Sequence, residues 1–410
     1  MKLALDGMRV IDMSRVFAGP IGAQILGDMG ADVIKVERPG VGDDGRAYGL
    51  AWVPGRDGIE TKLSSFFTAA NRNKRSITLN HATPEGQAIL RELVKTADVL
   101  IENYKVGDLK RFGLDYESLK EINPRLVYCS VTGFGQSGPM AARPGYDGLF
   151  QATGGIMAVT GIPDGQPGAG PMKVGPSLVD FMTGHNAALA IMSALLYRER
   201  SGEGQYIDIA LLDSSVAMVS HIMQDYLISG EAPPRFGNGG NGGGPADIIH
   251  CQDGMLYITA GGDAHWRRLT VLMGQPELYD DERFNNNMKR AKLNRVELME
   301  IINTWSRQFT VAKLQEMFDE QSIPAARYNE LDEVWDEPQV KYRGLRATTP
   351  QPWAASGSVD LIASPLAHMS TTPATIRRAP PLLGEHTAEV LGSLGYDEAA
   401  IAGLRDKGVI

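Results

Sequence analysis

The 410-residue chain contains only two cysteines, Cys129 and Cys251, which lie far apart in the sequence. Neither belongs to a Cys-x-x-Cys pair, and the seven histidines never recur at a spacing of three or four residues. These absences argue against a disulfide framework and against a zinc site on a helix face. We therefore expect a protein of a reducing compartment that holds no metal.

Long hydrophobic runs and a basic charge balance are also absent. The most apolar segment, 185–197, is shorter than the ~20 residues of a membrane span, and the N-terminal residues enter a strand pattern, unlike a signal peptide. The net charge of −9 argues against nucleic acid as a partner. We expect a cytoplasmic protein without nucleic-acid or membrane partners. Basic clusters at Arg72–Arg75 and Lys105–Arg111 suit either a phosphorylated small molecule or a solvated surface.

Several common catalytic motifs are missing from the sequence. There is no P-loop pattern, no GxGxxG after the first predicted strand, no GxSxG elbow and no HExxH. The loop at 14–20 has a single glycine before Pro20, which disfavours a nicotinamide cofactor. A carboxylate nucleophile is therefore the leading catalytic option.

Apolar runs of strand length alternate with runs of helix length in the first half of the chain. Residues 8–38 predict a β-α-β unit, with strands at 8–13 and 31–36 around a helix at 21–29. The alternation continues through elements predicted at 83–96, 98–101, 107–122, 126–131, 206–210 and 211–228. This order predicts an α/β fold with a Rossmann-like open parallel sheet, in which ligands bind beyond the carboxyl ends of the strands.

The composition changes after residue 228. A loop rich in glycine, asparagine and proline spans 231–245, and short strands and polar amphipathic helices follow it. We predict a large Rossmann-like domain over 1–228, a smaller α+β domain over 229–345, and a C-terminal segment over 346–410 that returns to the large domain. That segment is expected to be irregular and proline-rich before it ends in helices at 385–393 and 397–407.

Asp180 is the strongest candidate nucleophile. It follows a segment rich in glycine and proline and precedes apolar residues at helical spacing, so it is expected at or near a helix N-terminus. There the helix dipole and free amides favour the ionised form. An aspartate in such a position is more often a plain helix cap, and the local pattern does not decide between the two roles.

Three consecutive glycines, Gly242, Gly243 and Gly244, form a second candidate element. Because they have no side chains, they can lie against a reacting group and offer N–H donors to an oxyanion. A flexible linker between domains explains the same composition.

A series of motifs extends along the whole chain, at 18–20, 30–43, 73–76, 102–104, 111–114, 132–139, 144–147, 174–180, 204–209, 211–213 and 380–387. Each is a weak marker alone. Together and in this order they resemble the class III CoA-transferase family, also called the carnitine dehydratase and bile-acid-inducible family, which includes formyl-CoA transferase and α-methylacyl-CoA racemase.

The resemblance implies covalent catalysis by Asp180. The aspartate attacks the acyl-CoA thioester to give a mixed anhydride and a CoA thiolate, which then forms an aspartyl-CoA thioester. The acceptor carboxylate opens this thioester, and a last thiolate attack releases the new acyl-CoA. Coenzyme A is thus a substrate, and no cofactor is implied. Gly242, Gly243 and Gly244 fall on the loop that covers the aspartyl intermediate and excludes water.

The resemblance also implies which residues bind the substrates. Positions that contact CoA are Val16, Arg38, Arg72, Asn103, Tyr104 and Arg111. Arginines suit phosphates, and the Tyr104 ring can stack on adenine. We also predict substrate contacts at Phe17, Tyr48, Tyr146 and Asp147, and at Arg143 because it lies beside the Pro-Gly-Tyr turn. For the fold, the resemblance implies a large domain built from both chain ends, a small domain between them, and a homodimer of interlocked subunits.

Departures from the family patterns bear on the activity. Racemases have a histidine where this chain has Tyr146, whose ordinary pKa near 10 makes it a poor acid/base group. Formyl-CoA transferases have glutamine and tryptophan where this chain has Phe17 and Tyr48. We expect transfer of CoA from an acyl-CoA to a free carboxylic acid. A racemase that uses Tyr146, Asp147 or Asp180, and an inactive CoA-binding protein, are the alternatives. Arg143 would suit a dicarboxylic acid, although a surface arginine is an equal explanation.

Overall fold

The computed structural model describes residues 3–240 and 243–410. The chain divides into two compact units. The first comprises Met1–Gly154, Val174–Met218 and Pro338–Ile410, and the second comprises Gly155–Lys173 and Val219–Glu337. Compared with the predicted boundaries, the second unit also takes in the short segment before Val174 and begins ten residues earlier than 229.

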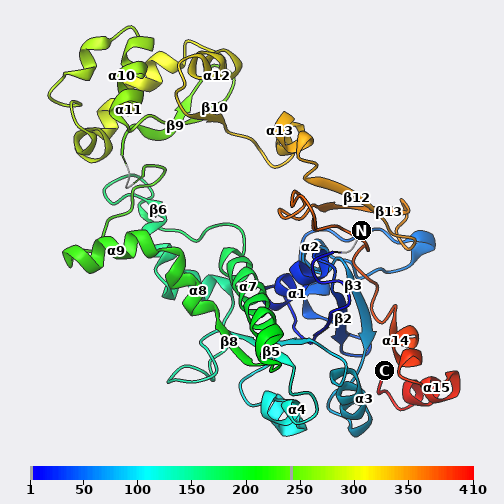
Figure 1. Cartoon of the computed structure of the whole chain (residues 1–410). Coiled ribbons are helices and arrows are strands. Elements are labelled where there is room, and N and C mark those ends of the chain that lie inside the picture. The colour runs from blue at the N-terminus through cyan, green and yellow to red at the C-terminus, as the bar shows by residue number, and fades with distance from the viewer. Residues whose placement is uncertain (1–2, 241–242) are drawn as a thin grey trace. The chain divides into compact units, whose positions relative to one another are not determined.

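The first unit is built on a six-stranded sheet in the order β3-β2-β1-β4-β5-β8, with every neighbouring pair parallel (Figure 1). The strands are β1 (Arg9–Asp12), β2 (Asp32–Glu37), β3 (Lys74–Thr78), β4 (Val99–Glu102), β5 (Val127–Thr132) and β8 (Tyr206–Ala210). The predicted open parallel sheet is confirmed. The strand order reverses between β1 and β4, which is the switch point where sheets of this type bind ligands.

Strand β3 is missing from the sequence prediction, because its charged residues suggest a surface. In the structure Lys74 is fully buried, and its ammonium donates to Asp12 at 2.7 Å, to the Pro20 carbonyl at 2.9 Å and to Asn71 at 2.9 Å. Arg72 is also buried. The solvated-surface interpretation of Arg72–Arg75 is therefore wrong, because these side chains find partners inside the fold.

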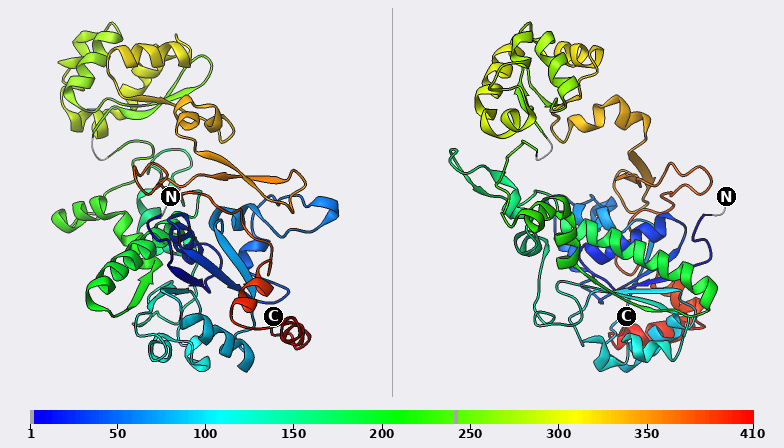
Figure 2. Two further views of the ribbon diagram at one scale, coloured as in Figure 1. Left: turned by 45° about the vertical axis from the view of Figure 1, so that its right-hand side comes forward. Right: turned by 60° about the vertical axis from the view of Figure 1, so that its left-hand side comes forward.

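Helices cover both faces of the sheet. On one face α1 (Ala18–Asp28) and α7 (Leu178–Ser201) pack along each other, as both views in Figure 2 show. Gly184 permits this approach, because a Cβ there would lie 2.7 Å from the Ala18 carbonyl oxygen. On the other face the core is completed by α3 (Pro84–Val94), α4 (Tyr116–Lys120), α14 (Thr387–Ser393) and α15 (Glu398–Asp406).

Among the described residues, α7 is the one helix whose length and composition would allow it to cross a membrane. Its buried side includes Ala187, Ala188, Ile191 and Ala194. Packing of this side in the first unit accounts for much of its apolar character.

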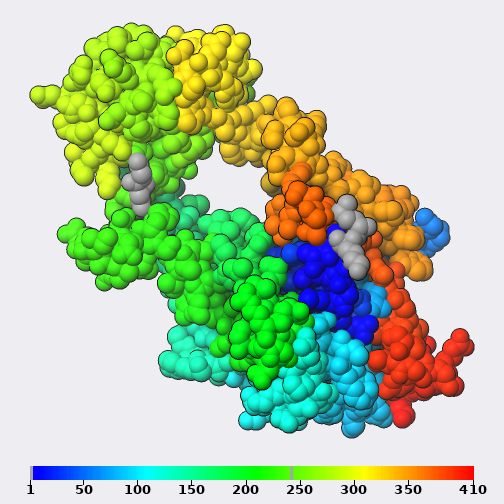
Figure 3. Space-filling model, in the orientation of Figure 1, coloured from blue at the N-terminus to red at the C-terminus, as the bar shows by residue number. Residues whose placement is uncertain are grey.

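The C-terminal segment returns to the first unit and covers the outer edge of β3. It contains a hairpin of β12 (Arg346–Pro350) and β13 (Ser358–Ile362) where the sequence predicts irregular chain. In Figure 3 the orange and red C-terminal residues lie against the blue N-terminal ones. Hydrogen bonds join Arg378 to Asn73, His386 to Ser76 and Asn80 to Val409.

The second unit contains a three-stranded antiparallel sheet with helices packed on it. Its elements are α6 (Ile156–Val159), β6 (Gly161–Ile162), β7 (Gly170–Pro171), α9 (Ser220–Ser229), β9 (Ala246–His250), β10 (Met255–Thr259), α10 (Asp263–Leu272), α11 (Arg295–Ser306), α12 (Val311–Glu320) and β11 (Ala325–Arg327). The remaining helices belong to the first unit: α2 (Ser65–Ala70), α5 (Asp147–Thr153), α8 (Leu211–Met218) and α13 (Pro338–Tyr342).

Candidate functional site

A cavity opens at the switch point of the sheet. It is lined by the loops after β1, β4 and β5, by residues 141–146 and by the first turn of α7. Seven of the predicted site residues meet here: Val16, Phe17, Asn103, Tyr104, Arg143, Tyr146 and Asp180. These residues come from segments spread over 165 positions of the chain, so the fold itself assembles them.

Asp180 is the third residue of α7 and faces this cavity. Its carboxyl makes no hydrogen bond with any described residue, and it is not a helix cap, since Ser177 precedes the helix. Burial and the nearby Asp147 carboxylate raise the pKa of Asp180 to about 7. The expectation that free helix amides favour its ionised form is wrong, because two of those amides already bind Asp147.

Asp147 is the first residue of α5. It is buried and does not line the cavity. Its Oδ2 accepts the Val179 N–H at 2.8 Å and the Asp180 N–H at 3.2 Å. The sequence predicts that Asp147 touches the substrate. That role stays a prediction, whereas its contacts here are with the backbone that carries Asp180.

The loop after β1 has an unusual backbone. Val16 has φ of 71°, a left-handed conformation that is rare for a β-branched residue. Its N–H donates to Asp43 at 2.8 Å, while the Asn103 side chain binds both the N–H and the carbonyl of Arg15, at 2.9 and 2.7 Å. The loops after β1 and β4 are thus tied together across the switch point, and these bonds hold the strained turn.

Arginine and aromatic side chains gather around Tyr104. The Arg15 guanidinium carbon lies 5.1 Å from the centre of the Tyr104 ring, and the His81 ring lies 5.0 Å away. Arg38 lines a small adjoining cavity and pairs with Asp44 at 2.6 Å. The sequence analysis did not predict Arg15 or His81 as site residues, although Val16, next to Arg15, was predicted. A cluster of this kind suits the phosphates and the base of a nucleotide.

Besides Arg38 and Asp147, three further predicted residues of the first unit lie outside the cavity lining. Arg72 is buried and forms two hydrogen bonds with Asp28, at 3.0 and 2.5 Å. Arg111 is exposed and pairs with Asp108 at 2.9 Å. Tyr48 is exposed and lies edge-on to the Phe66 ring, with 5.7 Å between the ring centres. The roles of Arg72, Arg111 and Tyr48 in substrate binding stay predictions.

Two polar groups in the cavity have no partner within the protein as described. Arg143 is exposed, its guanidinium forms no ion pair with the described residues, and its guanidinium carbon lies 5.9 Å from the centre of the Phe134 ring. Thr132 Oγ1 is buried without a hydrogen-bond partner among them. Both can donate hydrogen bonds to a carboxylic acid or a thioester. Over the same residues, no group of three or more His, Cys, Asp and Glu side chains is placed to hold a metal ion.

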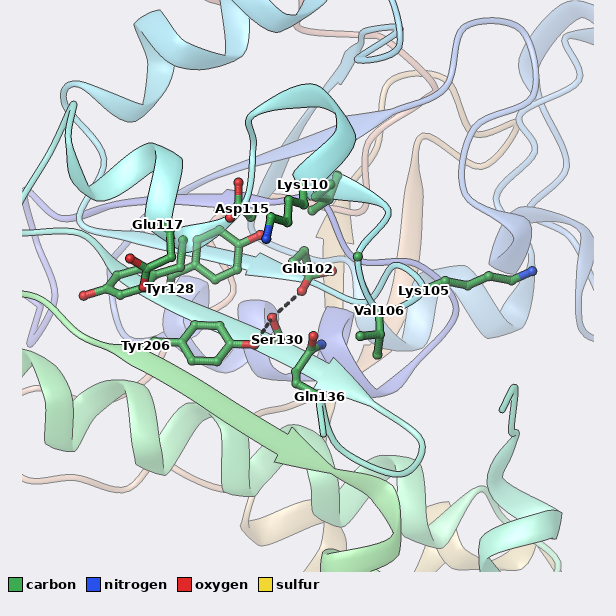
Figure 4. A pocket seen from close by; sticks show the side chains of 13 residues that line it. Glu102, Lys105, Val106, Lys110, Asp115, Glu117, Tyr128, Ser130, Gln136 and Tyr206 are labelled. Atoms are coloured by element: carbon green, nitrogen blue, oxygen red, sulfur yellow. Dashed lines mark hydrogen bonds between the residues drawn. The ribbon is translucent and has the colours of Figure 1, made fainter. Parts of the chain in front are cut away.

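A second cavity is lined by the loop after β4 together with Tyr128, Ser130 and Tyr206 (Figure 4). Tyr206 donates to Ser130 at 3.1 Å, and Ser130 donates to Glu102, whose other oxygen accepts the Tyr104 N–H at 2.7 Å. Burial raises the pKa of Glu102 to about 7. This chain of hydrogen bonds fixes the loop that carries Tyr104 into the Asp180 cavity.

The glycine run belongs to the second unit, and Gly242 lies outside the described residues. Gly243 and Gly244 are buried, and the Gly244 N–H donates to Asn287 at 2.8 Å. A Cβ at Gly243 would lie 2.5 Å from the Asn287 side chain, and one at Gly244 would lie 2.7 Å from the Ala291 Cα. Close packing within this unit therefore explains both glycines. The cover over an intermediate stays a prediction.

The chain is similar to known proteins over nearly its whole length. Residues 5–387 match the family described as CoA-transferase family III. The chain is 44% identical to a succinate–glutarate CoA-transferase of Agrobacterium fabrum, over 96% of both chains. It is 38% identical to a succinyl-CoA:mesaconate CoA-transferase of Haloarcula marismortui, over 96% of this chain and 97% of that one. A crystal structure of a CAIB/BAIF family protein from Brucella suis superposes with a TM-score of 0.85 at 39% identity. The match covers 96% of this chain and 100% of that one.

Proposed function

Because the chain belongs to CoA-transferase family III, and is thus a class III CoA-transferase, we propose that it moves CoA between dicarboxylic acids with Asp180 as the nucleophile. The donor would be an acyl-CoA such as succinyl-CoA, and the acceptor a small dicarboxylic acid such as glutarate. The observation that carries the proposal is the unbonded carboxyl of Asp180 at the switch-point cavity, in company with the unpaired Arg143.

The reaction would proceed through covalent steps on one carboxyl group. An Asp180 oxygen attacks the thioester carbon, the C–S bond breaks, and CoA leaves as a thiolate. The thiolate attacks the aspartyl carbonyl of the mixed anhydride and expels the donor acid. The acceptor carboxylate then displaces CoA from the aspartyl thioester, and the thiolate attacks the acceptor acyl carbon to regenerate Asp180.

The ionisation of Asp180 sets the pH range of this chemistry. Only the carboxylate is nucleophilic, and the pKa of Asp180 is about 7, raised by burial and Asp147. Transfer would therefore rise with pH through neutrality, since a raised pKa keeps part of the enzyme protonated below it.

Hydroxylamine trapping tests the covalent intermediate. Incubation with succinyl-CoA and hydroxylamine should convert Asp180, and no other carboxylate, to a hydroxamate that peptide mass spectrometry detects. The same treatment of Asp180→Asn serves as the control. An enzyme that transfers CoA without forming the Asp180 hydroxamate would contradict the proposal.

Arg143 would recognise the second carboxylate of the acids. Its guanidinium lies at the cavity without an ionic partner among the described residues, and a forked donor suits a carboxylate. Arg143→Leu should raise the KM for glutarate at least about tenfold, as loss of a charged hydrogen bond predicts, and Arg143→Lys should raise it less. A monocarboxylic acceptor, and Arg125→Leu on the surface, are the controls. Equal effects on mono- and dicarboxylic acids would contradict this role.

A racemase would need two acid/base groups at the α-carbon. Asp180 qualifies by its pKa, but both oxygens of Asp147 accept hydrogen bonds within the protein, and Tyr146 is largely exposed. The transferase therefore fits these residues better. Exchange of the α-proton of a branched acyl-CoA for deuterium, faster than CoA transfer, would favour the racemase instead.

We further propose that the chain forms a homodimer. Apolar side chains on α7, among them Leu189, Leu196 and Tyr197, are each more than half exposed in the single chain. Exposed apolar surface of this kind supports a protein interface. Light scattering of the purified protein should give twice the mass of one chain, and a monomer at micromolar concentration would contradict this.

A further inference from the structure

The first turn of α7 is held from outside its own helix. Ser177, the residue before the helix, makes no side-chain cap hydrogen bond. The amides of Val179 and Asp180 are instead satisfied by Asp147, which lies more than thirty positions earlier on α5. An N-terminal turn normally draws its acceptors from the residue that precedes the helix. Here the acceptor comes from a different element.

Asp147 is in turn held by Gln151, one turn later on α5. The Gln151 Nε2 donates to Asp147 Oδ1 at 2.5 Å. The same side chain also accepts the Val174 N–H at 2.8 Å and donates to the Val174 carbonyl at 3.3 Å. Asp147 and Gln151, which we name the α5 clasp, therefore hold both ends of the segment that leads from Val174 into Asp180.

The side chain of Asp180 has no bond of its own to fix it among the described residues, so its position depends on its backbone. We propose that the α5 clasp aims Asp180 into the cavity, with Asp147 as a positioning residue for nucleophilic attack. This inference rests on the proposed function, in which Asp180 is the nucleophile. It departs from the sequence prediction, in which Asp147 binds substrate.

The charge of Asp147 gives the clasp a second effect. Other charged or titratable groups at the cavity are Arg15, Asp44, Tyr104, Lys105, Arg143 and Tyr146. None of them forms a hydrogen bond or ion pair with Asp180 among the described residues, and Asp147 adds to burial in raising its pKa. A proton and an acyl group both remove the negative charge of Asp180, so repulsion from Asp147 favours either one. Asp147 would thereby make the Asp180 carboxylate a stronger nucleophile once it has ionised.

Asp147→Asn removes the charge of the clasp but keeps an acceptor for α7. Its amide oxygen can still accept from the α7 amides, whereas its Nδ2 cannot accept from Gln151 Nε2, so the bond to Gln151 is lost together with the charge. The acidic limb of the plot of kcat/KM against pH should shift to lower pH by at least about one unit, because the repulsive charge is gone. At pH values above this limb, kcat should fall about tenfold, because a less basic carboxylate is a weaker nucleophile. Asp147→Ala removes the acceptors as well and should lower kcat about a hundredfold, with the KM for acyl-CoA within about threefold.

Asp397→Asn is the matched control. Asp397 accepts the Ala400 N–H at 2.8 Å and caps α15, so the substitution removes a carboxylate charge at a helix N-terminus without touching α7. It should leave the pH profile in place. An unmoved limb and an unchanged kcat in Asp147→Asn would overturn the inference. A rise in KM for the acceptor at constant kcat would also overturn it and assign Asp147 to substrate binding.

A measurement without substrate keeps this test independent of the proposed function. In protein labelled with carbon-13 at aspartate carboxyl groups, the Asp180 signal is identified by its loss in Asp180→Asn. Its titration midpoint should fall in Asp147→Asn. If the wild-type enzyme transfers no CoA, the proposed function fails, yet the midpoint still reports on the clasp. A midpoint equal to that of the wild type overturns the charge effect whatever the activity.

Discussion

Asp12 and Asp180 are two carboxylates of the same unit, one fully buried and one partly buried at a cavity, and their electrostatic surroundings are opposite. Asp12, the last residue of β1, is fully buried; its Oδ2 lies 2.7 Å from the Lys74 ammonium and 3.8 Å from that of Lys35. Asp180 has no cation bonded to it among the described residues, and the charge that acts on it is that of Asp147.

The two surroundings drive ionisation in opposite directions. Burial by itself raises the pKa of Asp12, but Lys35 and Lys74 bring it below the ordinary value. At Asp180, burial and Asp147 act together and raise the pKa to about 7. Burial alone therefore does not distinguish a structural carboxylate from a reactive one; the sign of the neighbouring charge does.

The charge cluster around Asp12 stabilises the loop that lines the cavity of Asp180. Lys35 binds Asp43 at 2.8 Å and the Ser14 carbonyl at 2.9 Å. Asp43 in turn accepts the Val16 N–H, so the buried charges hold the loop that lines the Asp180 cavity.

Asp180→Asn should give the largest effect. CoA transfer should fall ~10⁴-fold or more, because an amide does not attack a thioester. Mass spectrometry of the acyl-CoA products measures it, and calorimetric binding of CoA, expected to be unchanged, is the control. A variant with more than about a tenth of the wild-type turnover would place Asp180 with Asp12 among structural carboxylates.

Asp12→Asn should mainly cost stability. Lys35 and Lys74 would lose a shared counterion in a fully buried site, at a cost of about 3–5 kcal/mol. Denaturant unfolding measures this cost. The double variant Asp12→Asn with Lys74→Met should recover part of it, because it removes both members of the pair. If the single variant unfolds like the wild type, the charge cluster is not the scaffold described here.

The difference in stability between Asp180→Asn and the wild type should depend on pH. In the wild type the folded-state pKa of Asp180 is raised from 3.8 to about 7, so the native state holds a proton that the unfolded chain releases. Between about pH 4 and pH 7 wild-type stability therefore falls as pH rises, by on the order of 2–3 kcal/mol from this group. The asparagine variant lacks this loss.

Melting temperatures of the two proteins measure this difference. Asp180→Asn should melt a few degrees above the wild type near pH 8, and the gap should shrink towards pH 4.5. Asp397→Asn should show no such change with pH. A gap that widens on acidification would give the pKa shift the opposite sign.

The smallest effect is expected at a carboxylate that is paired but exposed. Asp360 on β13 pairs with Arg346, and both side chains are more than two-fifths exposed. Surface pairs contribute about 0–1 kcal/mol, so Asp360→Asn should shift the melting temperature by less than about 2 °C. A loss as large as that of Asp12→Asn would mean that burial adds nothing to the strength of these pairs.

Sequence patterns located most of the regular elements. The predicted strands at 206–210 and 255–259 and the helix at 311–320 match the structure, because alternating or periodic apolar residues mark them locally. The parallel sheet followed from the alternation of these elements, and the position of Asp180 near a helix start followed from the glycine and proline residues before it.

The charge environment of the site was beyond local patterns. Lys74 lies in a buried strand although it is charged, because its ammonium pairs with Asp12. Since Asp12 is 62 residues away in the sequence, no local pattern could indicate this pairing. The α7 amides that were expected to stabilise ionised Asp180 instead donate to the Asp147 carboxylate. The position of Asp147 depends on how α5 packs, which no local pattern reveals. The glycines at 243 and 244 are explained by Asn287 and Ala291, which no spacing connects to them. Each miss is a contact between residues distant in sequence.

The covered edge of β3 has a consequence for synthesis on the ribosome. Asn80, just beyond the end of β3, donates to the Val409 carbonyl, so this contact forms only after residue 409 has been synthesised. At about 5–20 residues per second, the intervening residues take on the order of 15–65 s to translate. During that time the nascent strand edge is open to other chains, and chaperone demand during expression should concentrate there. Supplying residues 373–410 as a separate peptide should shorten this exposure and raise the soluble yield of a chain that stops at residue 372.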